Sequence, residues 1–77
     1  MALITNIKRI EKEKNTVHKQ VDTTYSSFLE KNGELYFQID TYGSNDRQMR
    51  GKISQSVQLD KNAAKELIKL LKSEFKI

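Results

Sequence analysis

The dipeptide Asn32-Gly33 constrains the fold of this chain more than any other feature of the sequence. Both residues tolerate the positive φ angles that a two-residue hairpin turn requires, and strand-like runs precede and follow them. The sequence therefore predicts a β-hairpin in which Asn32 and Gly33 are the two turn residues. In this register Phe28 faces Phe37 across the hairpin, and Tyr25 faces Asp40.

This register divides the hairpin side chains between two faces of a sheet. One face is aliphatic and phenyl in character and carries Phe28, Leu35, Phe37 and Ile39, with Thr24 and Ser26. The other is richer in tyrosine and polar groups and carries Tyr25, Leu29, Tyr36, Gln38, Asp40 and Tyr42. We expect the first face to belong to the core and the second to remain accessible.

A second strand pattern and a helix follow near the C-terminus. Residues 52–59 alternate strictly, with Ile53, Val57 and Leu59 on one face and Lys52, Ser54, Ser56 and Gln58 on the other. Asp60 is a suitable N-cap, and apolar residues then recur at helical spacing: Ala63, Ala64, Leu67, Ile68, Leu70, Leu71 and Phe75. Lysines 61, 65, 69 and 72 lie opposite this stripe, as expected of a solvated helix face.

The N-terminal third gives weaker signals. Leu3, Ile4, Ile7 and Ile10 fit a strand about as well as a helix, and their β-branched character favours a strand. Residues 11–15 then predict a charged turn, and residues 16–29 a long strand.

The expected fold is therefore α+β: a four-stranded antiparallel sheet in the order β-β-β-β-α, with the C-terminal helix packed on one face. Because the helix stripe is aliphatic, it should cover the apolar sheet face made by Phe28, Phe37, Ile39, Ile53, Val57 and Leu59.

Composition narrows the class of protein. A chain of 77 residues is expected to form one domain, residues 1–77, and its small size favours a homodimer that buries additional apolar surface. The sequence has no cysteine and a single histidine, so neither a disulfide framework nor a multi-histidine metal site is expected, and no cofactor is predicted. Without a signal peptide or a bilayer-spanning apolar run, a cytoplasmic protein with no membrane partner is expected.

The face left uncovered by the helix is the candidate functional surface. The net charge of +4 permits an anionic partner, and aromatic, hydroxyl and basic side chains converge on this face. A solvated sheet face would show similar polar alternation, so this is one of two interpretations. The candidate nucleic-acid-binding residues are Tyr25, Tyr36, Gln38, Tyr42, Arg47, Arg50, Lys52, Ser54 and Ser56.

The loop at residues 44–50, bracketed by Gly43 and Gly51, would form a rim of this surface, although Asp40 and Asp46 partly neutralise its basic residues. Catalysis is not expected. A magnesium site would need carboxylates that converge, whereas Asp40 is expected on a strand and Asp46 on a loop. His18 and Asp22 would lie about 13 Å apart along a strand.

Two resemblances are carried by these motifs. "FQIDTYGSNDR", "GKISQSVQLD" and the amphipathic helix resemble a group of short bacterial, phage or plasmid reading frames of unassigned role. More weakly, "FQID" on the third strand and "GKIS" at the start of the fourth are similar to the single-stranded-DNA-binding domain of the transcriptional coactivator called positive cofactor four. That second resemblance implies dimerisation through the helices and a binding surface that includes Tyr36, Gln38, Arg50, Lys52 and Ser54.

Two functions of different classes follow from the sequence. The first is a noncatalytic protein, coactivator-like in fold, that binds single-stranded DNA or RNA on the uncovered sheet face and dimerises through the C-terminal helix. The alternative is a small phage- or plasmid-type accessory or anti-defence protein that binds and modulates a host protein or a small anionic ligand.

Overall fold

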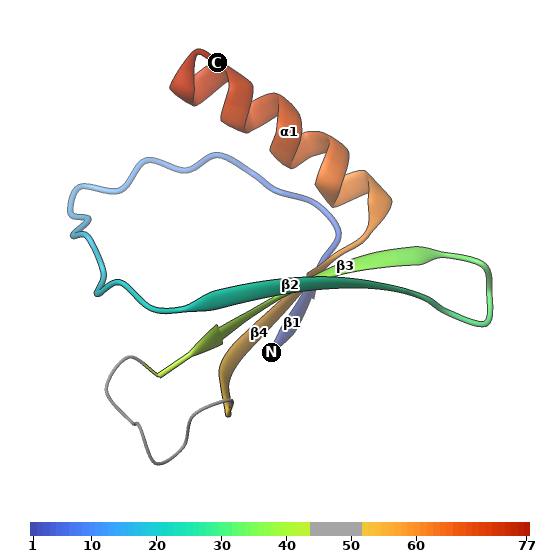
Figure 1. Ribbon diagram of the computed structural model, residues 1–77. Coiled ribbons are helices and arrows are strands. Elements are labelled where there is room, and N and C mark those ends of the chain that lie inside the picture. The colour runs from blue at the N-terminus through green and yellow to red at the C-terminus, as the bar shows by residue number, and fades with distance from the viewer. Residues whose placement is uncertain (44–51) are drawn as a thin grey trace.

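The computed structural model describes residues 1–43 and 52–77 and contains four strands and one helix within them. The strands are β1 (Ala2–Ile4), β2 (Thr23–Leu29), β3 (Leu35–Tyr42) and β4 (Ile53–Leu59), and the helix is α1 (Lys61–Phe75). Figure 1 shows α1 lying on one side of the twisted sheet. The α+β class and the order of elements predicted from the sequence are confirmed.

The sheet is mixed, and the prediction of a purely antiparallel sheet is wrong. Its strand order is β1-β4-β3-β2, and β1 runs parallel to β4, with Ala2 opposite Val57 and Ile4 opposite Leu59. The N-terminal strand ends at Ile4, and residues 5–22 form a long connection before β2. Because β1 and β2 lie at opposite edges of the sheet, this connection must pass from one edge to the other.

The hairpin between β2 and β3 is present, but its loop is one residue longer than predicted. Glu30 and Glu34 close the loop through a backbone bond of 2.9 Å, and the Gly33 N–H donates to the Glu30 carbonyl. Gly33 has φ of +86°, whereas Asn32 does not have positive φ, so this is not the two-residue turn with two left-handed residues. The Asn32 side chain instead accepts a bond from the Glu34 N–H.

The longer loop shifts the register of β2 by one residue and reverses its two faces. Phe28 now pairs with Tyr36, and Tyr25 pairs with Ile39. The predicted pairs Phe28 with Phe37 and Tyr25 with Asp40 are therefore wrong. Tyr25 and Leu29 lie on the side of the sheet nearer α1, and Phe28, Ser26 and Thr24 lie on the opposite side.

A β-bulge interrupts the alternation predicted for β4. Thr41 pairs with Gln55 but Tyr42 pairs with Ile53, so Ser54 is the extra residue. Ile53 consequently shares a face with Tyr42 and not with Val57 and Leu59, as the strict alternation had predicted. Its side chain is 40% exposed.

Helix α1 begins where the sequence predicts. The Asp60 side chain accepts a 2.8 Å hydrogen bond from the Ala63 N–H, which satisfies one of the free donors of the first turn. The helix ends at a left-handed residue, Lys76, whose N–H donates to the Lys72 carbonyl.

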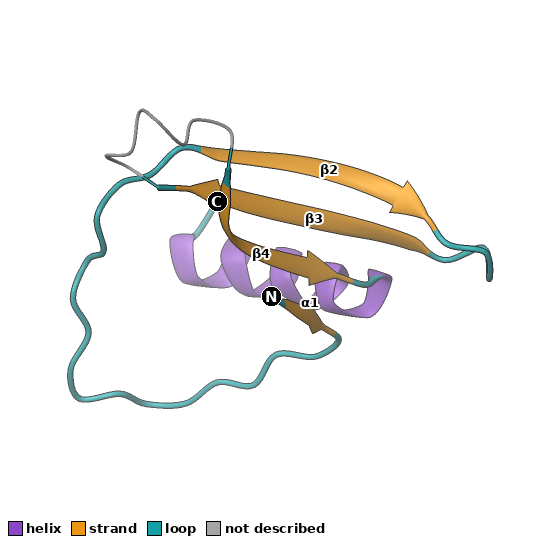
Figure 2. Ribbon diagram, turned by 90° about the horizontal axis from the view of Figure 1, so that it is seen from below, coloured by secondary structure: helices purple, strands orange, loops and turns teal. Residues whose placement is uncertain are grey.

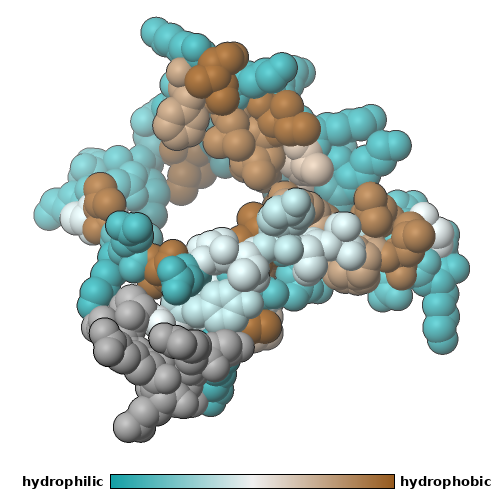
Figure 3. All heavy atoms as spheres, in the orientation of Figure 1, coloured by the Kyte–Doolittle hydropathy of each residue, from teal (hydrophilic) through white to brown (hydrophobic). Residues whose placement is uncertain are grey.

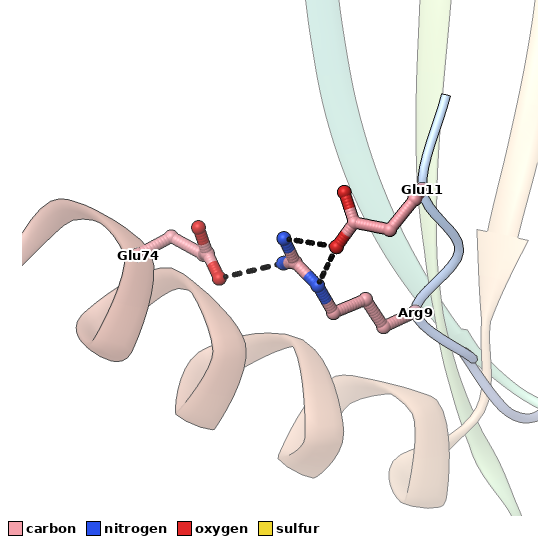
Figure 4. Close-up of polar contacts among 3 residues, drawn as sticks. All are labelled: Arg9, Glu11 and Glu74. Atoms are coloured by element: carbon pink, nitrogen blue, oxygen red, sulfur yellow. Dashed lines mark hydrogen bonds and ion pairs between the residues drawn. The ribbon is translucent and has the colours of Figure 1, made fainter. Parts of the chain in front are cut away.

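The start of the long connection is tied to α1 by polar contacts. The Asn62 amide donates to the Thr5 carbonyl, and the Ile7 N–H donates to the Glu66 carboxylate. Further along, Arg9 forms ion pairs with both Glu11 and Glu74, at 3.0 and 3.1 Å (Figure 4). These contacts hold the first part of the connection beside the helix.

The helix covers only part of the sheet. Seen from below in Figure 2, α1 lies behind β4 and β1 and leaves β2 without a helix behind it. Leu59 and Ala63, which are 6% and 0% exposed, are the buried apolar residues in the described parts of the chain. The prediction that α1 packs on Phe28 and Ile53 is wrong, because both side chains lie on the other face.

Candidate functional site

The sheet face that points away from α1 is called the open face. In the structure its side chains come from all four strands: Leu3, Thr24, Ser26, Phe28, Tyr36, Gln38, Asp40, Tyr42, Ile53, Ser56 and Gln58. Their alternation with residues of the opposite face follows from the two-residue period of a strand.

An aromatic pair lies at the hairpin end of the open face. The rings of Phe28 and Tyr36, which face each other across β2 and β3, stack with centroids 5.7 Å apart and planes inclined by 29°. Both side chains are half-buried. They line a shallow groove of about 550 Å³ together with Leu3, Glu30, Lys31, Asn32 and Gln58. The groove therefore joins two aromatic rings, two amides, a lysine and a glutamate.

A relay of side-chain hydrogen bonds crosses the centre of the open face. The Gln38 amide nitrogen donates to both carboxylate oxygens of Asp40, at 3.0 and 3.1 Å. Gln58 in turn donates from its amide nitrogen to the Gln38 carbonyl oxygen at 2.8 Å. Asp40 is 8% exposed and is the buried charged residue of the described chain.

The chemistry of these groups fixes the orientation of each amide. An ionised carboxylate can only accept hydrogen bonds, so Gln38 must turn its NH₂ group toward Asp40. Its carbonyl oxygen is then directed to Gln58, which must present its own NH₂ group. Gln58 consequently holds one orientation at the edge of the aromatic groove, and its carbonyl oxygen points away from Gln38.

A hydroxyl pair extends the polar surface toward the end of β3. The Thr24 and Tyr42 hydroxyls lie 2.9 Å apart and are hydrogen-bonded. Ser56 pairs with Asp40 across β3 and β4. The open face thus grades from an aromatic end near the hairpin to a hydroxyl-rich end near Tyr42.

The candidate residues chosen from the sequence are distributed unevenly. Tyr36, Gln38, Tyr42 and Ser56 lie together on the open face. Tyr25 does not, because the shifted register places its ring against Phe37 on the other face, with centroids 5.2 Å apart.

The remaining candidates lie at or beyond the end of β4. Lys52 directly precedes the strand and is exposed, and Ser54 occupies the bulge. Arg47, Arg50 and the predicted loop 44–50 lie outside the described residues, as does Asp46.

Three residues that line the aromatic groove, Phe28, Lys31 and Gln58, are not among the candidates predicted from the sequence, although the proposed function depends on them. Phe28 was assigned to the core because a two-residue turn was assumed. Gln58 was placed on the correct face by alternation but was not recognised as part of a relay. Lys31 precedes the turn and carried no signal of its own. A three-residue loop ending in glycine would have been the signal for Phe28.

In residues 1–43 and 52–77 no cluster of three or more potential metal ligands occurs. No helix in the described chain is long and apolar enough to cross a membrane.

The fold and site define a small α+β protein with a mixed four-stranded sheet and an aromatic and amide-bearing open face. Comparisons with protein families, curated proteins and solved structures gave no match for this chain. The two resemblances drawn from sequence motifs therefore remain predictions.

Proposed function

We propose that this chain is a noncatalytic protein that binds single-stranded DNA or RNA on its open face. The observation that carries the proposal is the groove in which the Phe28–Tyr36 pair lies beside Lys31 and Gln58. Stacking of unpaired bases on aromatic rings, with cationic groups nearby for phosphates, is the usual way in which proteins hold single strands.

Each group in the groove has a distinct part in this proposal. The rings of Phe28 and Tyr36 provide half-buried apolar surface for one base. The amide of Gln58, held in one orientation by the relay, provides hydrogen bonds to the edge of that base. Lys31 provides a positive charge for an adjacent phosphate, although Glu30 in the same groove reduces the local potential.

Asp40 and Asp46 together are the sequence argument against phosphate binding, and the surroundings of Asp40 favour a different role for that residue. Its carboxylate is buried and accepts two hydrogen bonds from Gln38. We propose that it positions the relay and does not face the ligand. An anionic strand passing over the aromatic end of the sheet would then meet the amides of Asn32 and Gln58, with Glu30 as the carboxylate of the groove.

The function proposed is tested by titrating fluorescently labelled single-stranded oligonucleotides at two salt concentrations. Binding should weaken as salt rises, since phosphate contacts release counterions. Replacing Lys31 with glutamine should lower the affinity similarly for all sequences and reduce the steepness of the salt dependence by roughly one phosphate contact. Absence of binding at low salt would overturn the proposal and favour the accessory-protein alternative.

The two tyrosines on opposite faces provide a matched control. Tyr36→Leu should lower the affinity by about 1 to 3 kcal/mol, the usual value of one stacked base. Tyr25→Leu removes the same ring from the other face of the sheet and should leave the affinity unchanged. Leucine retains apolar bulk at both positions, so the comparison reports on stacking. Equal effects of the two changes would contradict binding on the open face.

We further propose that the chain is a homodimer joined through α1, as expected from its size.

A further inference from the structure

Two apolar surfaces of this chain, one on the sheet and one on α1, face each other but do not pack together. The sheet surface consists of the exposed side chains on the α1 side of β2 and β3, of which Tyr25, Leu29 and Leu35 are 73%, 70% and 56% exposed. The helix surface continues along α1 with Ile68, Leu71 and Phe75, which are 58%, 41% and 70% exposed. Side chains of this kind are normally buried in a small domain.

A hollow separates these two surfaces. It has a volume of about 820 Å³ and is lined on the sheet side by Ser27, Leu35 and Phe37, and on the helix side by Ala64, Leu67 and Ile68. Figure 3 shows apolar side chains gathered around this hollow between α1 and the strands. The hollow is open to solvent, and its apolar lining is surface that a partner would bury favourably.

The overall dimensions show how much surface the chain leaves uncovered. The chain exposes 7356 Å², whereas a compact monomer of 9.0 kDa exposes about 4,900 Å². Its radius of gyration is 14.9 Å, against about 11.5 Å for a compact domain of this length. Obligate homodimers bury about 1,000 to 2,500 Å² on each partner. Covering even half of the excess surface would therefore reach the size of an obligate homodimer interface.

We propose that the hollow is filled by a second copy of this chain, with α1 of each copy packed on the β2–β3 surface of the other. The apolar stripe of a helix commonly packs on the apolar face of a sheet. Each copy of this chain has one exposed surface of each kind. In a two-fold dimer the contact is then made twice, helix on sheet and sheet on helix. This arrangement deepens the proposed homodimer and differs from a helix-to-helix contact.

Among the described residues only Leu59 and Ala63 are buried apolar residues, so further burial of apolar surface is expected to stabilise the fold. A second copy supplies apolar surface of the same kind, at concentrations above the dissociation constant of the dimer. The chain's own long connection does not, since residues 10–22 carry only Ile10, Val17 and Val21 as apolar side chains, and Val17 is fully exposed.

The first test measures the molar mass of the 77-residue chain in solution by sedimentation equilibrium at micromolar concentration. The expected mass is twice the 9.0 kDa of one chain. A monomer would overturn the proposal. Oligonucleotide binding is measured separately on the same sample, so a monomer that still binds single strands would refute the dimer alone, and a dimer that binds none would refute the binding function alone.

The second test distinguishes the two ways of pairing α1. The chain has no cysteine, so single-cysteine variants can be mixed and oxidised without side reactions. Leu35→Cys mixed with Ile68→Cys should give a disulfide-linked pair joining the two variants, because position 68 of one copy lies over position 35 of the other. Lys69→Cys, on the lysine side of the helix, is the matched control and should link to position 35 at least tenfold less.

Linkage of Ile68→Cys to itself, with none to position 35, would contradict the reciprocal arrangement and indicate a helix-to-helix dimer. Both substitutions keep an apolar side chain at a partly exposed position, so each variant is expected to fold. Circular dichroism of each variant before mixing verifies this.

Discussion

Asp40 provides a sharp test of the relay on the open face. In Asp40→Ala the NH₂ group of Gln38 loses both acceptors in a half-buried position, since Asp40 itself is 8% exposed and accepts at 3.0 and 3.1 Å. Leaving a buried donor unsatisfied costs about 1 to 3 kcal/mol, and bonds to a charged group lie toward the upper part of that range. We expect the free energy of unfolding to fall by about 2 kcal/mol.

Asp40→Asn is the matched control. The asparagine oxygen can still accept one bond from Gln38, so this variant should lose about half as much stability as the alanine variant. Both are measured by urea unfolding followed by circular dichroism at one fixed protein concentration, because an associating chain unfolds at a midpoint that depends on concentration. A stability of Asp40→Ala equal to that of the wild type would show that the relay does not contribute to the fold.

Three further changes test the local structure, each followed by urea unfolding. Gly33→Ala should cost about 1 to 2 kcal/mol, because φ of +86° is unfavourable for a residue with a Cβ although no atom lies within 4 Å of it; an unchanged stability would contradict this loop geometry. Asp60→Ala should cost about 1 kcal/mol by removing the helix cap, and Asp60→Ser should restore most of it. Arg9→Ala should change the stability by less than about 0.5 kcal/mol, since Arg9 and Glu74 are mostly exposed; a loss above 1 kcal/mol would mean that the connection is anchored more firmly than the contacts indicate.

Local signals predicted much of this fold. The helix and its Asp60 cap depend on residues close together in the sequence, and both are present as predicted. The hairpin and the strand before the helix were also identified from local patterns.

The errors come from features that the sequence specifies weakly. A loop of two or three residues around Asn32-Gly33 satisfies the same residue preferences, yet the choice decides which face carries Phe28 and Tyr25. The bulge at Ser54 is hidden within a strictly alternating run. The parallel pairing of β1 with β4 joins residues more than fifty positions apart, and no local pattern reports it.

For the candidate site too, local sequence patterns predict some features, whereas others depend on strand register. Tyr36, Gln38, Tyr42 and Ser56 share a face because they alternate within strands, and alternation is visible in the sequence. The aromatic pair and the relay depend on which residues face each other across strands, so they required the register.

The open face as the binding surface is tested most directly by amide chemical shifts of the ¹⁵N-labelled chain, recorded as an unlabelled single-stranded oligonucleotide is added. The largest changes are expected at Phe28, Lys31, Tyr36, Gln38 and Gln58. Changes confined to α1 and to the sheet surface around Tyr25 and Leu35, with none at these five positions, would contradict binding on the open face.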